Sequence, residues 1–407
     1  MKTTVAVFFG GRSTEHEISV ISASQAMHAI NRDRFDVVPV YISKQGHWYT
    51  GDALLDVKNY RDMKQLLSDC EEVYMRPIYG DTNLYKVRKP MFGSDVVRRI
   101  DVVIPVLHGA NGEDGTFEGF LEQCGVPYAG CNTLASANGM DKITMKQILS
   151  ANGIPVVDYE WFTDQQWHSR REELLGRIEN NLGYPVIVKP ANLGSSVGIS
   201  SAHNREELID AVNEAQRYST RLIVEHMVKN LKEINCSVLG DADEFQTSVL
   251  EEPIKSGDFL SYEEKYLGGG GGKGAVKGGA KNSRRGMASS QKKFPADLPD
   301  DMTREIQRLA GETFRVLSCH GVSRVDVMVD DDTKKIYVNE INTIPGSLSF
   351  YLWEGSGVTF DKLMERLVAL ALKRRRQLET KTLSFDQNIF AMGGGVKGGA
   401  KGGVKGA

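Results

Sequence analysis

Residues 323–342, SRVDVMVDDDTKKIYVNEIN, carry the densest set of side chains with catalytic potential. Their alternating pattern on either side of a charged run predicts two strands joined by a turn. Because residues two apart on a strand share a face, Arg324 lies beside Asp326. On the partner strand Glu340 lies beside Asn342, and a turn within the charged run places Glu340 opposite Asp326. Two carboxylates and an amide oxygen on one patch are suited to hold Mg²⁺ against the phosphates of a nucleotide.

Two features of this hairpin bear on its interpretation. Arg324 is placed to neutralise an anion that develops during a reaction. Residues 343–346 read Thr-Ile-Pro-Gly, and a glycine after proline lets a backbone N–H approach a substrate oxygen closely. Taken alone, such a hairpin is more often a solvated face with cross-strand ion pairs. The adjoining Pro-Gly turn favours the metal-site interpretation.

A second segment, PVIVKPANLGSSVGIS at residues 185–200, predicts a strand that ends in Lys189 and runs into a Gly-Ser-Ser-x-Gly loop. Loops of this kind offer several backbone N–H groups to phosphate oxygens, and a lysine at the strand end adds a fixed positive charge. A glycine-serine loop alone is more often a plain turn. With the lysine, phosphate binding and a plain turn remain equally good interpretations.

Two further loops follow apolar strands, GGRSTEHE at residues 10–17 and HGANGEDG at residues 108–115. The first is explained equally well as a strand-to-helix turn in which Ser13 caps the helix. A zinc-protease helix would need a second histidine at position 20, which is Val20, so that class is excluded. The second loop can be read as a polar loop with turn glycines.

The elements that must position these residues fall into several units, as the length of 407 residues suggests. Strands and helices alternate over residues 1–135, which predicts an N-terminal domain with an open parallel sheet. A second unit covers residues 136–220. The third, residues 221–380, contains the hairpin and an amphipathic helix, and residues 381–407 form a tail.

Two low-complexity segments, residues 268–281 and 393–407, share the sequence VKGGAK. Neither fits the phosphate-loop pattern GxxxxGK[ST], because Leu267 stands six positions before Lys273 where a glycine is required. Their composition predicts a flexible linker or tail. The first segment directly follows SYEEKY within the third unit, so we expect it to extend a mobile flap.

The overall composition narrows the class of protein. The 50 basic and 53 acidic side chains give a formal net charge of -3, which offers no broad field for nucleic acid or an anionic membrane. The 5 cysteines are scattered without a CxxC pair, as in a chain whose thiols stay reduced. No apolar run approaches the ~20 residues that span a bilayer. We therefore expect a cytoplasmic protein with small-molecule partners.

Taken together and in order, these segments resemble the D-alanine–D-alanine ligase family over about residues 1–380. Each motif is only moderately specific, but their joint order and spacing are very specific. The resemblance rests on GGRSTEHEIS, HGANGEDGTFEGFLE, PYAG, MDK, VKPANLGSSVGIS, EEKY and RVDVMVD followed by VNEINTIPG.

The resemblance implies a three-domain ATP-grasp fold of the α/β and α+β classes, with ATP held between the second and third units. By this analogy Lys142 and Lys189 bind the ATP phosphates, and Lys265 contacts the γ-phosphate. Backbone groups of the loop with Ser195 and Ser196 close over the phosphates.

The same resemblance implies the remaining nucleotide and metal contacts. Glu225 and the backbone from His226 through Met227 to Val228 line the adenine pocket, and Glu233 holds the ribose hydroxyls. Two Mg²⁺ ions, with Mn²⁺ as an alternative, are held by Asp326, Glu340 and Asn342.

For the amino-acid substrates, the resemblance implies that Glu15 binds the ammonium of the first D-alanine and is linked through Ser195 to Tyr266. His108 is a weaker candidate for the same pocket. The first carboxylate takes the γ-phosphate to form an acyl phosphate, which the second amine then attacks. Arg324 and the Gly346 N–H stabilise the resulting oxyanion. A lid that carries Lys265 and Tyr266 excludes water.

The chain departs from the common family pattern after Gly346, where it reads SLSFYL. Many relatives place there a serine that holds the second carboxylate, and Ser347 and Ser349 are equal candidates for that role. The Gly/Lys-rich insert after Tyr266 is the other departure.

Alternative functions remain within and outside this family. D-serine or D-lactate is an alternative second substrate, although Tyr266 favours an amide product over an ester. A non-catalytic nucleotide-binding protein is disfavoured because the catalytic positions are all present. The family is commonly dimeric, and the sequence leaves a homodimer open.

Overall fold

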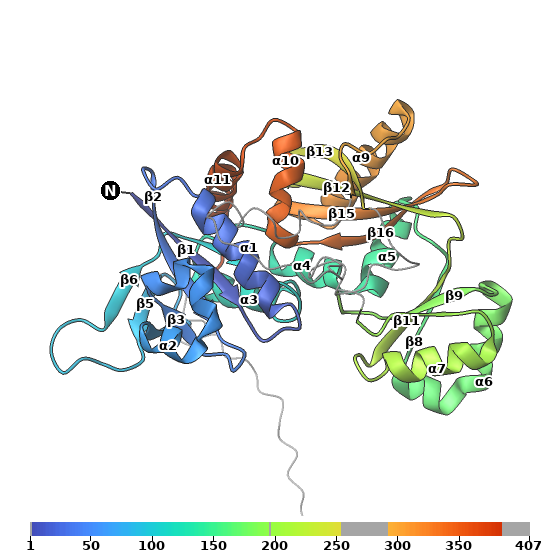
Figure 1. Ribbon diagram of the computed structural model, residues 1–407, viewed down its shortest axis with the longest axis horizontal. Coiled ribbons are helices and arrows are strands. Elements are labelled where there is room, and N and C mark those ends of the chain that lie inside the picture. Colours follow the sequence, from blue (N-terminus) through green and yellow to red (C-terminus); the bar gives the residue numbers. More distant parts are fainter. Residues whose placement is uncertain (1, 195–196, 254–291, 385–407) are drawn as a thin grey trace, which may run out of the picture.

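Three β-sheets form the framework of this protein, as seen in a computed structural model that describes residues 2–194, 197–253 and 292–384 (Figure 1). The N-terminal sheet lies at one end of the molecule and a four-stranded sheet at the other, with a five-stranded sheet between them (Figure 1). Several predicted features lie outside the described residues. They are Ser195, Ser196, Lys265, Tyr266, the insert at 268–281 and the tail from residue 385 onward.

The N-terminal sheet has seven strands in the order β6-β5-β4-β3-β2-β1-β7. β1 pairs in parallel with both β2 and β7, which confirms the predicted parallel sheet for these three strands. The remaining strands extend it as an antiparallel meander, so the complete sheet is mixed. The strands are β1 (Thr3–Gly10), β2 (Phe35–Ile42), β3 (Trp48–Thr50), β4 (Glu71–Met75), β5 (Asn83–Lys86), β6 (Val96–Arg99) and β7 (Val102–Val106).

The parallel strands of this sheet position two of the predicted loops. The last six residues of β1 and all of β7 are buried, as expected of parallel strands covered on both faces. Since Phe9 pairs with Val106, both strands end at the same edge of the sheet. The loops after them, residues 11–15 and 107–115, therefore meet there. Helices and 3₁₀ turns connect the strands: α1 (His16–Ala29), η1 (Asp52–Leu55), η2 (Val57–Arg61), α2 (Met63–Ser68) and α3 (Thr116–Cys124).

The four-stranded sheet has the order β10-β9-β11-β8, and α6 and α7 lie on its outer side (Figure 1). Before it come α4 (Thr133–Met140) and α5 (Lys142–Ala151), the latter capped by Asp141, whose carboxylate accepts the N–H of Thr144 at 2.8 Å. The remaining elements are β8 (Tyr159–Thr163), α6 (Asp164–Asn181), β9 (Val186–Pro190), β10 (Ser200–Ala202), α7 (Arg205–Ala215) and β11 (Arg221–His226).

One predicted boundary differs from the structure. The sequence predicts that the third unit begins at residue 221, but β11 pairs with β8 and β9 and belongs to the four-stranded sheet. The sequence of an apolar strand does not show which sheet the strand joins. The hydrophobic periodicity therefore could not assign β11 to its sheet. The change of sheet comes between His226 and Leu231.

The five-stranded sheet has the order β14-β13-β12-β15-β16 and contains the predicted hairpin. β15 and β16 pair antiparallel, with Arg324 opposite Asn342 and Asp326 opposite Glu340, which confirms the predicted register. The predicted amphipathic helix is α9, which buries Ile306, Ala310 and Phe314. The elements are β12 (Leu231–Gly240), β13 (Phe245–Pro253), β14 (Lys292–Lys293), α9 (Asp300–Val316), β15 (Gly321–Asp330), β16 (Ile336–Asn342), η5 (Gly346–Ser349), α10 (Phe350–Gly355) and α11 (Phe360–Glu379).

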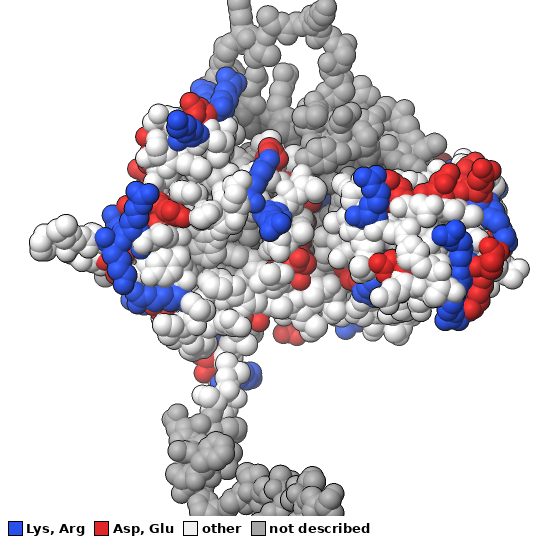
Figure 2. All heavy atoms as spheres, turned by 90° about the horizontal axis from the view of Figure 1, so that it is seen from below, with Lys and Arg blue, Asp and Glu red and all other residues white. Residues whose placement is uncertain are grey.

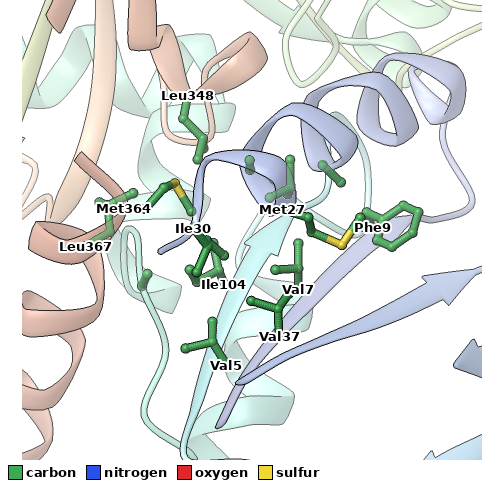
Figure 3. Close-up of a cluster of buried hydrophobic side chains, with 14 of the residues drawn as sticks. Val5, Val7, Phe9, Met27, Ile30, Val37, Ile104, Leu348, Met364 and Leu367 are labelled. Atoms are coloured by element: carbon green, nitrogen blue, oxygen red, sulfur yellow. The ribbon is translucent and has the colours of Figure 1, made fainter. Parts of the chain in front are cut away.

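A shared core joins the N-terminal sheet to the C-terminal helices. Figure 3 shows Val7 and Ile104 of the sheet beside α1, with Leu348 of η5 and Leu367 of α11 in the same cluster. Burial of each such side chain contributes roughly 1.5–3 kcal/mol. Leu348 thus anchors the segment after Gly346 against the N-terminal domain.

The surface shown in Figure 2 carries charges of both signs, which are most concentrated over the end formed by α6 and α7. Many are paired there, as in the contacts of Arg205 with Glu179 and Glu172. This face presents no large field of one sign. Across the described residues, no helix has the length and apolar character needed to cross a membrane.

Candidate functional site

A cleft between the four-stranded and five-stranded sheets gathers many of the predicted site residues. The space between its walls is ≈ 880 Å³ when the open mouth is included. Strands from both sheets and the start of α5 line it. The charged residues at its walls are Lys142, Lys189, Glu233, Arg324, Asp326 and Glu340.

The acidic side of the cleft is the hairpin of β15 and β16. Asp326 receives two hydrogen bonds from Arg324, from Nε at 2.6 Å and from Nη2 at 2.7 Å. The Asn342 amide nitrogen donates to the same carboxylate at 3.1 Å. Glu340 lies 3.4 Å from Lys142 Nζ. The side chains of Asp326 and Glu340 are 17% and 26% exposed, so both can reach a ligand in the cleft.

This arrangement fits a divalent cation that is shared with phosphates. Two carboxylates and an amide lie on one face, and hard oxygen donors of this kind suit Mg²⁺, which takes only one or two protein carboxylates. Within residues 2–194, 197–253 and 292–384, no three His, Cys, Asp or Glu side chains gather as a metal cluster.

The basic side of the cleft is supported by a buried cluster of two lysines and one carboxylate. Lys189 Nζ donates to Glu225 at 2.6 Å, and Lys146 Nζ lies 3.2 Å from the other carboxylate oxygen. All three residues are buried. Lys142 is held separately, donating to the Leu193 carbonyl at 2.7 Å. The buried Glu225 carboxylate thus balances the positive charge of Lys189.

Lys146 was not among the predicted site residues. It lies one turn after Lys142 on α5, and an i,i+4 pair of lysines in a helix that also carries apolar residues was the available signal. Burial lowers the pKa of Lys146 in spite of the nearby Glu225 carboxylate. The pKa of Lys189 is raised, because its interactions with Glu225 outweigh burial.

Lys146→Met is expected to change the free energy of unfolding by less than about 1 kcal/mol, because Glu225 keeps Lys189 as its counter-charge and the new side chain is apolar. Urea unfolding measures the difference. Lys44→Met, which breaks an exposed pair with Glu17, is the control. A loss of 3 kcal/mol or more, roughly the cost of an uncompensated buried charge, would contradict this account.

Glu225 also predicts a pH dependence of stability. Burial alone raises the pKa of Glu225, but the charges of Lys146 and Lys189 outweigh it and lower the pKa from 4.5 to about 2. The nearby Tyr159 of β8 adds no charge at acidic pH. Since the folded pKa lies below the unfolded one, this stabilisation is present above pH 4.5 and is lost as the pH falls toward 2.

We therefore expect the wild-type protein to lose on the order of 2 kcal/mol more unfolding free energy than Glu225→Gln between about pH 5 and about pH 3. Denaturant unfolding at a series of pH values measures this. Parallel pH profiles for the two proteins would show that Glu225 does not titrate in this range.

Glu15 and His108 meet at the carboxyl edge of the N-terminal sheet. Both are buried, and a Cβ added to Gly194 would lie 3.4 Å from a Glu15 carboxylate oxygen. Glu15 therefore faces the loop that runs into residues 195–196. His108 contacts the Ile344 carbonyl and the Ser22 hydroxyl, each at 2.9 Å. This ties the N-terminal loop to the segment before Gly346.

Glu113 joins this group and was not predicted from the sequence. Its carboxylate accepts the N–H of Gly109 at 2.7 Å and that of Ile344 at 3.3 Å. Burial, with a smaller effect from the Glu15 charge, raises its pKa well above the usual range. The only available signal was its place in the HGANGEDG loop.

The remaining predicted residues lie outside this central group. Met227 and Val228 follow β11. The Met227 N–H donates to the Pro185 carbonyl at 3.2 Å. Val228 packs against Met328, which lines the cleft.

Ser347 and Ser349 are buried in η5, where residues 347–349 all have positive φ. Such backbone strain costs energy and persists only where packing enforces it.

Comparison with solved structures places this fold and site in a class. The VanG D-Ala:D-Ser ligase from Enterococcus faecalis superposes with a TM-score of 0.75 and 32% identity, covering 91% of this chain and 100% of that one. The D-alanine-D-alanine ligase from Coxiella burnetii gives 0.74 and 30%, covering 93% and 96%. The fold and the cleft thus define an ATP-grasp ligase.

Sequence comparison then narrows the class to a family. The family models described as D-ala D-ala ligase N-terminus and C-terminus match residues 4–131 and 148–369. The D-alanine--D-alanine ligase of Thermosipho melanesiensis is 39% identical over 387 residues, 95% of this chain and 97% of the relative. That of Caldicellulosiruptor bescii is 41% identical over 383 residues, 92% and 97%. The chain belongs to the D-alanine–D-alanine ligase family.

Proposed function

We propose that this protein joins two D-alanine molecules, using ATP, to make D-alanyl-D-alanine for peptidoglycan precursors. The relatives that carry this name match nearly its whole length. The observation that carries the proposal is the cleft itself, whose walls bring Lys142 and Lys189 together with Asp326 and Glu340.

ATP binds in this cleft with its phosphates against Lys142 and Lys189. Both ammonium groups are held in place by other contacts, so little side-chain order has to be gained on binding. Glu233 at the cleft wall takes the ribose hydroxyls. Met227 and Val228 form the adenine end, while the buried Glu225 acts as the counter-charge of Lys189. Ser195, Ser196 and Lys265 complete the phosphate site.

The carboxylates of Asp326 and Glu340, with Asn342, would hold Mg²⁺, in two sites and with Mn²⁺ as an alternative. A divalent cation supplies charge neutralisation at the phosphates. The two carboxylates that oppose one another on one face of the hairpin support this role, because Mg²⁺ is commonly held by one or two carboxylates together with phosphate oxygens.

The reaction runs in two steps. Glu15, with Ser195 and Tyr266, holds the ammonium of the first D-alanine. A carboxylate oxygen of this D-alanine attacks the γ-phosphorus, so that an acyl phosphate forms and ADP leaves. The ammonium of the second D-alanine loses a proton to water, and the free amine attacks the acyl carbon. The nitrogen gives a second proton to water as the amide forms. Arg324 and the Gly346 N–H stabilise the oxyanion, and inorganic phosphate leaves with the C–O bond electrons.

The test is phosphate release from Mg-ATP with D-alanine, D-serine, D-lactate and L-alanine, and identification of the products by mass. Release with D-alanine together with a D-alanyl-D-alanine mass is the expected result. D-serine is the second candidate for the second substrate, because a structurally similar relative is titled a D-Ala:D-Ser ligase. A dominant mixed product would move the assignment there, and no release with any of them would refute the proposal.

The setting of the enzyme follows from its substrates. All five cysteines are free, as in a reducing compartment, and ATP is used, so we place the reaction in the cytoplasm.

A homodimer is proposed on family resemblance, and light scattering would test it. The domains are proposed as residues 1–135, 136 to the end of β11, and the following residues to 380.

A further inference from the structure

The segment after Gly346 leaves the second amino acid without an evident partner. Ser347 and Ser349 were the candidates, but they are only 2% and 0% exposed. The Ser347 N–H donates to Ser22 at 2.9 Å, which turns this residue toward α1. Neither serine lines the cleft. The other described side chains of this segment are therefore the candidates for this contact.

Tyr351 is the residue of this segment that lies near a residue of the cleft wall. It lies at the start of α10, and its side chain is hydrogen-bonded to the carboxylate of Glu251 on β13. Its phenol is also close to the guanidinium of Arg324, which lines the cleft. Two residues later, the Trp353 indole N–H donates to the Ser237 hydroxyl at 2.9 Å. Since Ser237 is the cross-strand neighbour of Arg324, α10 is fixed over this end of the site.

Glu251 continues a row of polar residues across the sheet. In the pairing register, Glu251 is opposite Asn235, Asn235 is opposite Asp326, and Asp326 is opposite Glu340. Directly opposed residues lie on one face of a sheet. Asn235, Asp326 and Glu340 line the cleft, so Glu251 faces the same side, one strand beyond. The Asn235 amide donates to Glu251 at 3.4 Å.

We propose that Tyr351 and Glu251, with Arg324, form the subsite for the second amino acid and select an amine over a hydroxyl nucleophile. This rests on the proposed ligase function. An amino acid enters as a zwitterion, and the subsite offers one positive group, one negative group and a phenol held between them. Arg324, which also serves the oxyanion, attracts the carboxylate by its positive charge, and Glu251 attracts the ammonium.

The selectivity follows from charge. D-lactate has the carboxylate and a hydroxyl of similar size but no ammonium, so it can give the buried Glu251 carboxylate only a hydrogen bond from a neutral hydroxyl in place of one from a cation. Hydrogen bonds between two charged groups are stronger than those with a neutral partner, so the subsite favours the amino acid over the hydroxy acid. Tyr351 keeps Glu251 pointed at this position.

The experiment compares wild type with Tyr351→Phe and Glu251→Gln, using D-alanine and D-lactate together and measuring both products by mass. Glu251→Gln is expected to lower the ratio of dipeptide to depsipeptide about tenfold or more. Tyr351→Phe is expected to raise the KM for the second amino acid about tenfold while the KM for ATP stays within about twofold. Calorimetry with a non-hydrolysable ATP analogue measures D-alanine binding without turnover.

Tyr128→Phe is the matched control, because Tyr128 is a buried phenol hydrogen-bonded to Glu122 at 2.6 Å in the N-terminal domain. It should change neither KM. An unchanged product ratio in Glu251→Gln, or an unchanged second-substrate KM in Tyr351→Phe, overturns the inference. Absence of any D-amino-acid product from the wild type overturns the proposed function instead, and with it this subsite.

Discussion

Glu340→Gln is expected to lower kcat for D-alanine-dependent phosphate release at least about 100-fold, while the melting temperature stays within about 2 °C. Glutamine keeps the size of the side chain but removes the charge that faces Lys142 at 3.4 Å. A metal ligand carries several kcal/mol of charge stabilisation into the transition state. Because Glu340 is 26% exposed, folding depends little on its charge.

Paired measurements decide between a catalytic and a structural role for Glu340. Thermal melting and steady-state rates are measured on the same preparations, at several Mg²⁺ concentrations. Glu71→Gln serves as the control, since Glu71 forms a comparable pair with Lys86 at 2.9 Å in the N-terminal sheet. A fully active Glu340→Gln enzyme would remove this residue from the proposed mechanism, and a large drop in melting temperature would assign it to the fold.

The parts of this site that the sequence predicted well are those set by local pattern. The hairpin register follows from strand alternation around one charged turn, so Asp326 and Glu340 were placed opposite one another and the structure confirms it. A shared pocket for Glu15 and His108 was expected only from the family resemblance, and the parallel pairing of β1 with β7 explains why their loops meet. In both cases the decisive contacts lie between neighbouring elements.

The parts that the sequence did not predict depend on contacts between distant elements. β11 was assigned to the wrong unit because only its partners β8 and β9 identify its sheet. Lys146 looked like an ordinary helix lysine until Glu225, distant in the chain, was seen to meet it at 3.2 Å. Tyr351 became relevant only because α10 packs back onto β13. Periodicity carries no information on such pairings.

Arg324→Lys is expected to reduce kcat for dipeptide formation about 100-fold, the effect of losing one oxyanion donor. The guanidinium makes two hydrogen bonds to Asp326, at 2.6 and 2.7 Å, which orient it rigidly in the cleft. Lysine keeps the charge but has neither the planar fork nor the fixed direction of the donors. The Arg324 side chain is only 13% exposed, so misaligned donors in this buried position cost much of the stabilisation of the oxyanion.

The ratio of phosphate released to dipeptide formed tests which step Arg324 serves. If Arg324 stabilises the oxyanion of the second step, the acyl phosphate still forms in Arg324→Lys but is attacked more slowly, so water competes and phosphate exceeds dipeptide. Arg308→Lys is the control. The Arg308 guanidinium also donates two hydrogen bonds to one carboxylate, that of Glu305, at 2.8 and 2.7 Å on the exposed face of α9. Equal loss of both products, with the ratio unchanged, would place Arg324 in the first step, where it would act on the phosphate through Asp326 rather than on the acyl carbon.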